Sequence, residues 1–175
     1  MTLRVRTLDG APEGWSALVA ADADATPAHE PALWYALRAA LPGMRIVVFE
    51  ARDEAGLAGG AAAAIERRAG LRWIHALPFV LPGTPLARSG RRAEVDHAIA
   101  GALAELQRDL RVAGGEWACY RPVGEAVPAD ALERLGGETR WLEAAVIDLG
   151  GGLDEMRRRM DRKTRQEIAR SAAPP

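Results

Sequence analysis

Residues 44–79, MRIVVFEARDEAGLAGGAAAAIERRAGLRWIHALPF, contain three consecutive stretches with the character of β-strands. The first, 44–50, is rich in β-branched side chains, which favour extended structure. The second, 57–67, begins with a run of glycine and alanine, and such small side chains predict close packing against a neighbour. The third, 71–79, follows a short Ala-Gly turn. Three strands joined by short turns predict an antiparallel meander.

Helical patterns flank this meander on both sides. The residues before it predict a short edge strand at 3–8 and two helices, which begin near Pro12 and Pro27. After it, apolar side chains at three- and four-residue spacing predict a long helix over 91–113, which the glycine pair at 114–115 would end. Two more strands and a last helix are expected at 116–122, 139–149 and 153–171.

The order of these elements predicts the fold class. A meander joined through a long crossover helix to further strands indicates an α/β (α+β) structure, with a mixed, largely antiparallel sheet flanked by helices. A length of 175 residues fits one domain and a short extension. We therefore expect a domain over 1–150, followed by a basic helix over 151–175.

Composition narrows the classes of function. The 23 basic and 24 acidic residues nearly balance, so the chain as a whole lacks the basic character of a general nucleic-acid binder. No apolar run reaches the roughly 18 residues of a membrane span, and the N-terminus lacks the apolar region of a signal peptide. One cysteine excludes an internal disulfide framework. We expect a soluble, cytoplasmic protein.

The short motifs of several common enzyme classes are missing. The sequence has no Walker loop, GxGxxG, HExxH, GxSxG or CxxC. Its three histidines lie far apart and have no His or Cys partner at helical spacing, so no metal site is expected. His29 lies near a predicted helix start, where a capping or a surface role suffices, and His97 is expected to be solvated.

His75 has two open interpretations. On a strand it would share a face with Trp73 and Leu77, which indicates a residue at the edge of the core with one hydrogen bond. It also lies near a strand end, beside a loop rich in proline and glycine, where it could carry a proton or contact a ligand. The residues alone favour the first interpretation. Arg121, at the end of a later predicted strand, is a further candidate for ligand contact.

The last predicted helix has the strongest charge pattern in the chain. Residues 156–170 include seven basic and two acidic side chains. A solvated basic face is one interpretation of this pattern. The other is recognition of phosphate or carboxylate groups by Lys163, Arg165 and Arg170.

These same residues carry a family resemblance. The stretch 153–170 resembles the characteristic helix of FemAB-like proteins of the GNAT acyltransferase superfamily, whose pattern is K-x-R-x-x-I-x-R. This pattern is matched by Lys163, Arg165, Ile168 and Arg170. The small-residue strand, the LPF strand end and the PGTPLA loop are similar as well, and the similarity extends over nearly the whole chain from about Trp15 onward.

The resemblance implies an acyltransferase of two tandem GNAT-like domains, of which this chain corresponds to the first domain, 1–150, and the linking helix, 151–175. Such proteins transfer an acyl or aminoacyl group from acyl-CoA or aminoacyl-tRNA to an amine, in bacterial cell-wall or exopolysaccharide synthesis. The expected partners are therefore the missing second domain or a second copy of the chain, and an amine-bearing acceptor. The residues expected to contact the acceptor or the neighbouring domain are Lys163, Arg165, Arg170, His75 and Arg121.

The GNAT loop that holds the diphosphate of coenzyme A, R/Q-x-x-G-x-G/A, is missing, and Pro82 removes a backbone N–H donor. We therefore expect this chain to bind no cofactor and to be inactive without a second domain. Nucleic acid other than aminoacyl-tRNA is not expected as a partner. The alternative is a non-catalytic GNAT-like module that acts through dimerisation or a partner protein.

Overall fold

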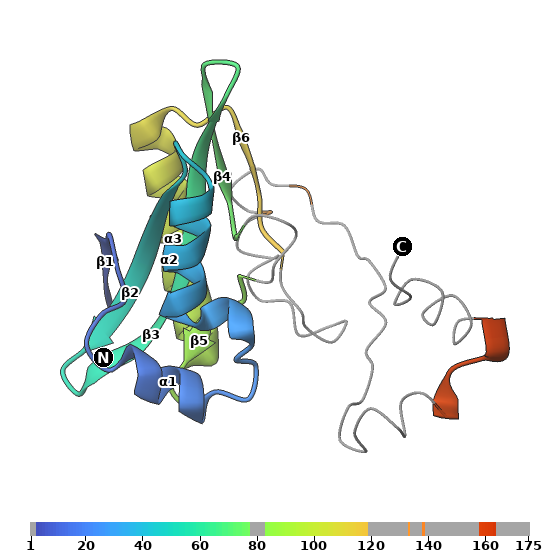
Figure 1. Cartoon of the computed structure of the whole chain (residues 1–175). Helices are drawn as coiled ribbons and strands as arrows, with labels where there is room; N and C mark the ends of the chain where they lie inside the picture. The colour runs from blue at the N-terminus through green and yellow to red at the C-terminus, as the bar shows by residue number, and fades with distance from the viewer. Residues whose placement is uncertain (1–2, 78–82, 119–132, 134–137, 139–157, 164–175) are drawn as a thin grey trace. The chain divides into compact units, whose positions relative to one another are not determined.

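The computed structural model describes residues 3–77, 83–118, 133, 138 and 158–163. The chain divides into two compact units, Met1–Thr139 and Arg140–Pro175. All the labelled helices and strands belong to the first unit (Figure 1). The domain boundary expected at residue 150 stays a prediction.

The described part of the first unit is built on one six-stranded sheet. Five strands follow the order β1-β2-β3-β4-β6, and β5 pairs with β3 beside this path. Strands β1 to β4 pair in antiparallel fashion, as the predicted meander requires, whereas β6 lies parallel to β4. The strands are β1 Arg4–Leu8, β2 Arg45–Asp53, β3 Gly56–Arg68, β4 Leu71–His75, β5 Leu86–Ala87 and β6 Gly114–Glu116.

Helices cover both faces of this sheet (Figure 1). One face packs against α1 and α2, where the rings of Trp15 and Trp34 meet edge to face with their centroids 5.2 Å apart. The other face packs against α3, whose Val95 and Ile99 contact the sheet. The helices are α1 Trp15–Ala21, a 3-10 turn Pro27–His29, α2 Pro31–Ala40 and α3 Arg92–Leu110.

The middle strand β3 consists only of glycine and alanine from 58 to 64. A Cβ atom added at Gly59 would lie 2.6 Å from Cγ1 of Val95, and one at Gly60 would lie 2.8 Å from Cζ3 of Trp15. Both distances are far shorter than van der Waals contact. The thin strand therefore lets α3 on one face and α1 on the other approach the backbone itself, which confirms the close packing expected from the sequence.

The long helix is shorter than the sequence suggested, and the glycine pair after it has another role. Helix α3 ends at Leu110, and Arg111 has a left-handed backbone with φ 50°. Gly114 and Gly115 do not end the helix, because they already belong to β6. A Cβ atom at Gly114 would lie 2.7 Å from the Trp73 ring, so glycine is needed here for β6 to approach β4.

Residues 71–77 do not divide into one buried and one exposed face. Leu77 is buried, but Leu71 is 54% exposed, and Ile74 on the opposite face of the sheet is 2% exposed. Because helices cover both faces of the sheet, alternation along the strand does not separate inside from outside.

The single helix expected over 153–171 is interrupted. The chain is helical on both sides of Met160 and Asp161 but not at these two residues. Like charges four residues apart, such as Arg158 and Arg162, repel one another and oppose a continuous helix. The strand expected at 139–149 lies outside the described residues.

The packing of β3 gives a first testable prediction. We expect Gly59→Ala to lower the free energy of unfolding by about 1–3 kcal/mol, because its Cβ overpacks the contact with Val95. Gly101→Ala is the matched control: it lies in α3 with open space around it, and alanine should raise the free energy of unfolding by up to about 1 kcal/mol. Denaturant unfolding of both variants measures this. Equal stability of the two would contradict the packing described.

A buried carboxylate in β2, that of Glu50, gives a second testable prediction. The side chain of Glu50 is 1% exposed, and its oxygens accept hydrogen bonds from Arg52 at 2.5 Å and from Arg6 at 2.5 and 2.9 Å. Burial acts to raise the pKa of Glu50, but the hydrogen bonds and charges of Arg52 and Arg6 outweigh it and lower the pKa below its usual 4.5. Protonation therefore favours the unfolded chain.

We expect the contribution of Glu50 to the free energy of unfolding to be constant above pH 4.5. This contribution should be lost as the pH drops through the lowered pKa of Glu50. Glu50→Gln should be less stable at neutral pH and should lose less stability on acidification. Denaturant unfolding between neutral and acidic pH compares the two proteins. If the free energy of unfolding falls equally steeply with pH in both proteins, Glu50 is not the group whose protonation destabilises the fold.

Candidate functional site

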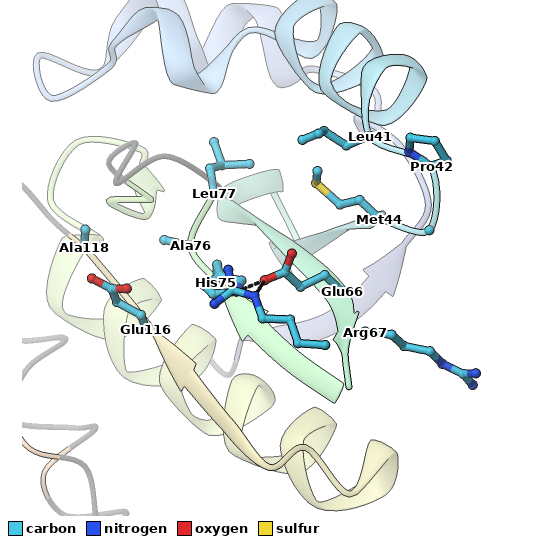
Figure 2. A pocket seen from close by; sticks show the side chains of 12 residues that line it. Leu41, Pro42, Met44, Glu66, Arg67, His75, Ala76, Leu77, Glu116 and Ala118 are labelled. Carbon is cyan, nitrogen blue, oxygen red and sulfur yellow. Dashed lines mark hydrogen bonds and ion pairs between the residues drawn. The ribbon is translucent and has the colours of Figure 1, made fainter. Parts of the chain in front are cut away.

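A pocket of about 500 Å³ lies between the α2–β2 connection and strands β3, β4 and β6 (Figure 2). This volume is typical of sites for small molecules. Titratable and charged residues on the strands form one wall, namely Glu66, Arg67, Arg68, His75 and Glu116. Apolar residues line the rest, chiefly Leu41, Pro42, Met44 and Leu77.

His75 and Glu66 form a hydrogen-bonded pair in this pocket. The turn between β3 and β4 sets Ala64 opposite His75 and Glu66 opposite Trp73, so both polar side chains stand on the same face of the sheet. Nε2 of His75 lies 2.8 Å from Oε1 of Glu66. Arg68 pairs with the same carboxylate oxygen. The His75 side chain is only 13% exposed, so the ring is held in place with one edge towards the pocket.

This pair selects one form of the neutral ring. An ionised carboxylate only accepts hydrogen bonds, so Nε2 of His75 carries the hydrogen and donates it to Glu66. Nδ1 then has a free lone pair, and among the described residues it has no hydrogen-bond partner. His75 is therefore set up to accept a proton at Nδ1, and Glu66 would stabilise the cation that forms.

A second carboxylate reaches the pocket from β6. The parallel pairing of β4 and β6 puts Glu116 in register with His75, and the N–H of Ala76 donates to the backbone oxygen of Glu116 at 2.9 Å. In Figure 2 the side chains of Glu66 and Glu116 lie on either side of His75. Because the Glu116 side chain is exposed and makes no ion pair among the described residues, it can receive a cation from solution.

The opposite wall is apolar. Leu41, Pro42 and Met44 come from the short connection between α2 and β2, and they face the polar wall across the cavity (Figure 2). A ligand that fills the pocket therefore meets the carboxylate of Glu116, the imidazole of His75, Arg67 and the Glu66–Arg68 ion pair on one side, and aliphatic side chains on the other. The Glu116 carboxylate and the aliphatic wall together suit an organic amine, whose charged nitrogen and apolar body need such different surroundings.

Among the expected site residues that the structure describes in the first unit, His75 lines the pocket. Its single hydrogen bond and low exposure agree with the core-edge interpretation, and its place in the pocket leaves ligand contact open. Lys163 is an exposed helical residue of the second unit. Arg121, Arg165 and Arg170 lie outside the described residues, so their expected roles stay predictions.

Sequence reasoning missed the two carboxylates. Glu66 could have been found, because the two-residue turn at 69–70 fixes a register in which Glu66 lies two residues from Ala64, the residue opposite His75, and therefore on the same face. Glu116 carried no such signal, because its place beside His75 depends on the parallel pairing of β4 with β6.

The other two histidines lie away from the pocket. His29 is 3% exposed; its Nδ1 accepts a hydrogen bond from the N–H of Thr26 at 2.9 Å, and its Nε2 donates to the backbone oxygen of Thr84 at 2.9 Å. It thereby caps the 3-10 turn before α2, which confirms the expected capping role. His97 is exposed on α3, as expected.

The described residues form neither a metal site nor a membrane-spanning helix. In the part of the chain that the structure covers, no three His, Cys, Asp or Glu side chains gather to hold a metal ion. None of the described helices has the length and apolar character to cross a membrane.

Comparison with known proteins identifies the fold. No family model and no curated protein matches the sequence. Among solved structures, an acetyltransferase of Trypanosoma brucei superposes with a TM-score of 0.52 at 18% identity, over 83% of this chain and 99% of that one. A probable acetyltransferase gives a TM-score of 0.53 at 14% identity, over 83% of this chain and 97% of that one.

A third match has a stated substrate. The glucosamine-6-phosphate N-acetyltransferase of Arabidopsis thaliana superposes with a TM-score of 0.50 at 13% identity, over 84% of this chain and 99% of that one. At such low identity these likenesses establish the architecture and nothing finer. These acetyltransferases share the mixed, largely antiparallel sheet with helices on both faces.

Proposed function

We propose that this protein transfers an acyl group to an amine and that the pocket beside His75 is its acceptor site. The observation that carries the proposal is the imidazole of His75 in a pocket of small-molecule size: its Nε2 is held by Glu66, and its Nδ1 has no hydrogen-bond partner among the described residues. On an acetyltransferase fold, these groups match the needs of amine acylation. The amine must be attracted as a cation, freed of a proton and shielded from water.

The proposed chemistry follows from these groups. The acceptor enters as an ammonium ion, which the exposed carboxylate of Glu116 attracts. Nδ1 of His75 takes one proton and passes it to solvent, and the neutral amine then attacks the carbonyl carbon of the donor thioester. A C–N bond forms and the C–S bond breaks; the nitrogen loses its second proton to Nδ1, which donates it to the leaving thiolate. Glu66 orients the ring and stabilises its cationic form.

The apolar wall narrows the class of acceptor. Leu41, Pro42 and Met44 would have to be desolvated by the bound molecule, and apolar contact supplies about 25 cal/mol for each Å² buried. A primary amine attached to an aliphatic arm satisfies both walls at once. A highly polar amine, such as an amino sugar, would leave the aliphatic wall without a partner.

The FemAB-like assignment, with an acyl or aminoacyl donor and a role in cell-wall or exopolysaccharide synthesis, is a finer proposal. It is supported by the K-x-R-x-x-I-x-R pattern of Lys163, Arg165, Ile168 and Arg170. In this proposal the basic residues contact an anionic acceptor or a neighbouring domain. Their substitution by alanine should weaken acceptor binding without changing the protonation chemistry of His75.

Acyl transfer to leucinamide tests the main proposal. With acetyl-CoA or S-acetylpantetheine as donor, we expect N-acetyl-leucinamide to form, and His75→Gln should lower kcat by about 10²- to 10⁴-fold, the usual contribution of a general base. His97→Gln, which changes the exposed histidine of α3, is the matched control and should retain activity. An active His75→Gln variant, or no transfer by the unmodified protein from either donor, would contradict the proposal; the second result would favour a non-catalytic module.

The state of the His75 ring is a separate prediction. Long-range ¹H–¹⁵N correlation spectra of the neutral ring should show Nε2 protonated and Nδ1 unprotonated, because Glu66 accepts the Nε2 hydrogen. Glu66→Ala removes the acceptor and should give a mixture of both forms. A neutral ring protonated at Nδ1 in the unmodified protein would remove the proposed proton acceptor.

A further inference from the structure

Helix α3 begins in a dense cluster of arginines. Arg88, Arg91 and Arg92 occupy its start, where the helix dipole also favours negative charge. Helix starts of this kind are common binding sites for phosphate groups. Here two carboxylates from other parts of the chain, Asp22 and Asp53, already occupy the cluster, each with a side chain only 1% exposed.

Asp22 accepts hydrogen bonds on both of its oxygens. Oδ2 accepts from the backbone N–H of Ala87 at 2.7 Å, and Oδ1 accepts from Nη2 of Arg92 at 2.5 Å and from the N–H of Asp24 at 2.9 Å. Burial acts to raise the pKa of Asp22, but these hydrogen bonds and the charge of Arg92 outweigh it and lower the pKa. The carboxylate is therefore ionised at neutral pH.

Asp53 neutralises the other two arginines in the same way. Its Oδ2 accepts from Nη2 of Arg88 at 2.5 Å and from Nη1 of Arg91 at 2.8 Å. All three guanidinium groups at the start of α3 are thus paired with carboxylates of the protein.

The backbone before α3 is equally occupied. The N–H of Gly83 donates to the oxygen of Ala118 at 2.7 Å, and that of Arg88 donates to the oxygen of Ala58 at 2.8 Å. Ala87 donates to Asp22, as described, and Pro85 has no N–H. A diphosphate needs a row of such donors, and those of Gly83, Ala87 and Arg88 are already used by the protein.

We infer that the Asp22 carboxylate takes the place of a bound anion at the start of α3, and that a donor such as acyl-CoA is not held there by its diphosphate. The donor would be recognised through its thioester arm instead. This second part rests on the proposed acyltransfer, whereas the occupancy of the anion site does not.

Rescue by a small anion tests the occupancy directly. Asp22→Ala vacates a site still lined by Arg92 and the N–H of Ala87, so its melting temperature should fall and then rise again, with saturation, as formate is added. Asp9→Ala, which breaks the exposed pair with Arg45, is the matched control and should show no saturable response. If the melting temperature of Asp22→Ala does not change with formate concentration, the inference is wrong.

If Asp22→Ala does not fold, calorimetric titration of the wild type and of Arg92→Met with coenzyme A tests the same inference. We expect no binding of coenzyme A that depends on Arg92, so wild type and Arg92→Met should behave alike. Coenzyme A binding that is lost in Arg92→Met would place the diphosphate at α3 and refute the inference.

The kinetic part compares two donors. If the diphosphate makes no anchoring contact, acetyl-CoA and S-acetylpantetheine should give kcat/KM values within about threefold of one another. A preference of more than about 100-fold for acetyl-CoA would show that the nucleotide contributes binding energy. Failure of both donors would refute the proposed acyltransfer, while formate rescue would still report on the anion site.

Discussion

Two glycines in the middle strand control the spacing of the whole first unit. At Gly59 and Gly60 the backbone of β3 is approached from one face by Val95 of α3 and from the other by Trp15 of α1, closer than any Cβ atom would permit. Strand β5 also pairs with β3 at these two residues. The short strand therefore holds the segment before α3 against the sheet, and this segment carries Ala87 to within hydrogen-bond distance of Asp22.

The pocket depends on a second close approach, between β4 and β6. Gly114 and Gly115 allow β6 to lie parallel to β4, and this pairing carries Glu116 to the level of His75. The meander supplies Glu66 on the other side of the ring. Proton acceptor and carboxylates thus come from three strands, so their geometry is as rigid as the sheet.

Much of the fold could be predicted from local pattern. The meander, the edge strand and the long helix all follow from residue type and periodicity, because alternation and helical spacing are visible in a short stretch of sequence. The role of Gly114 was wrongly predicted, because a glycine after a helix satisfies a helix end and a close strand contact equally well. His75 could be named but not interpreted, since only the register of β3 and β4 shows its carboxylate partner. The pairing of Asp22 with Arg92 could not be predicted from local pattern, because the two residues lie 70 positions apart in the sequence.

The two charged regions of the first unit differ in how their ions are paired. At the start of α3, Asp22 and Asp53 pair with all three arginines, whereas at the pocket Glu116 makes no ion pair among the described residues and is exposed. In our proposal a cationic acceptor is therefore attracted to Glu116, while an anion would find the carboxylate of Asp22 already bound at the start of α3.

Mapping of amide chemical shifts during titration with leucinamide tests this central claim most directly. If leucinamide binds in the pocket, the largest shifts should fall on residues 41–44, 75–77 and 116–118, which line it, and these shifts should diminish in Glu116→Gln. Shifts centred on residues 87–92 at the start of α3, or unchanged in Glu116→Gln, would contradict it.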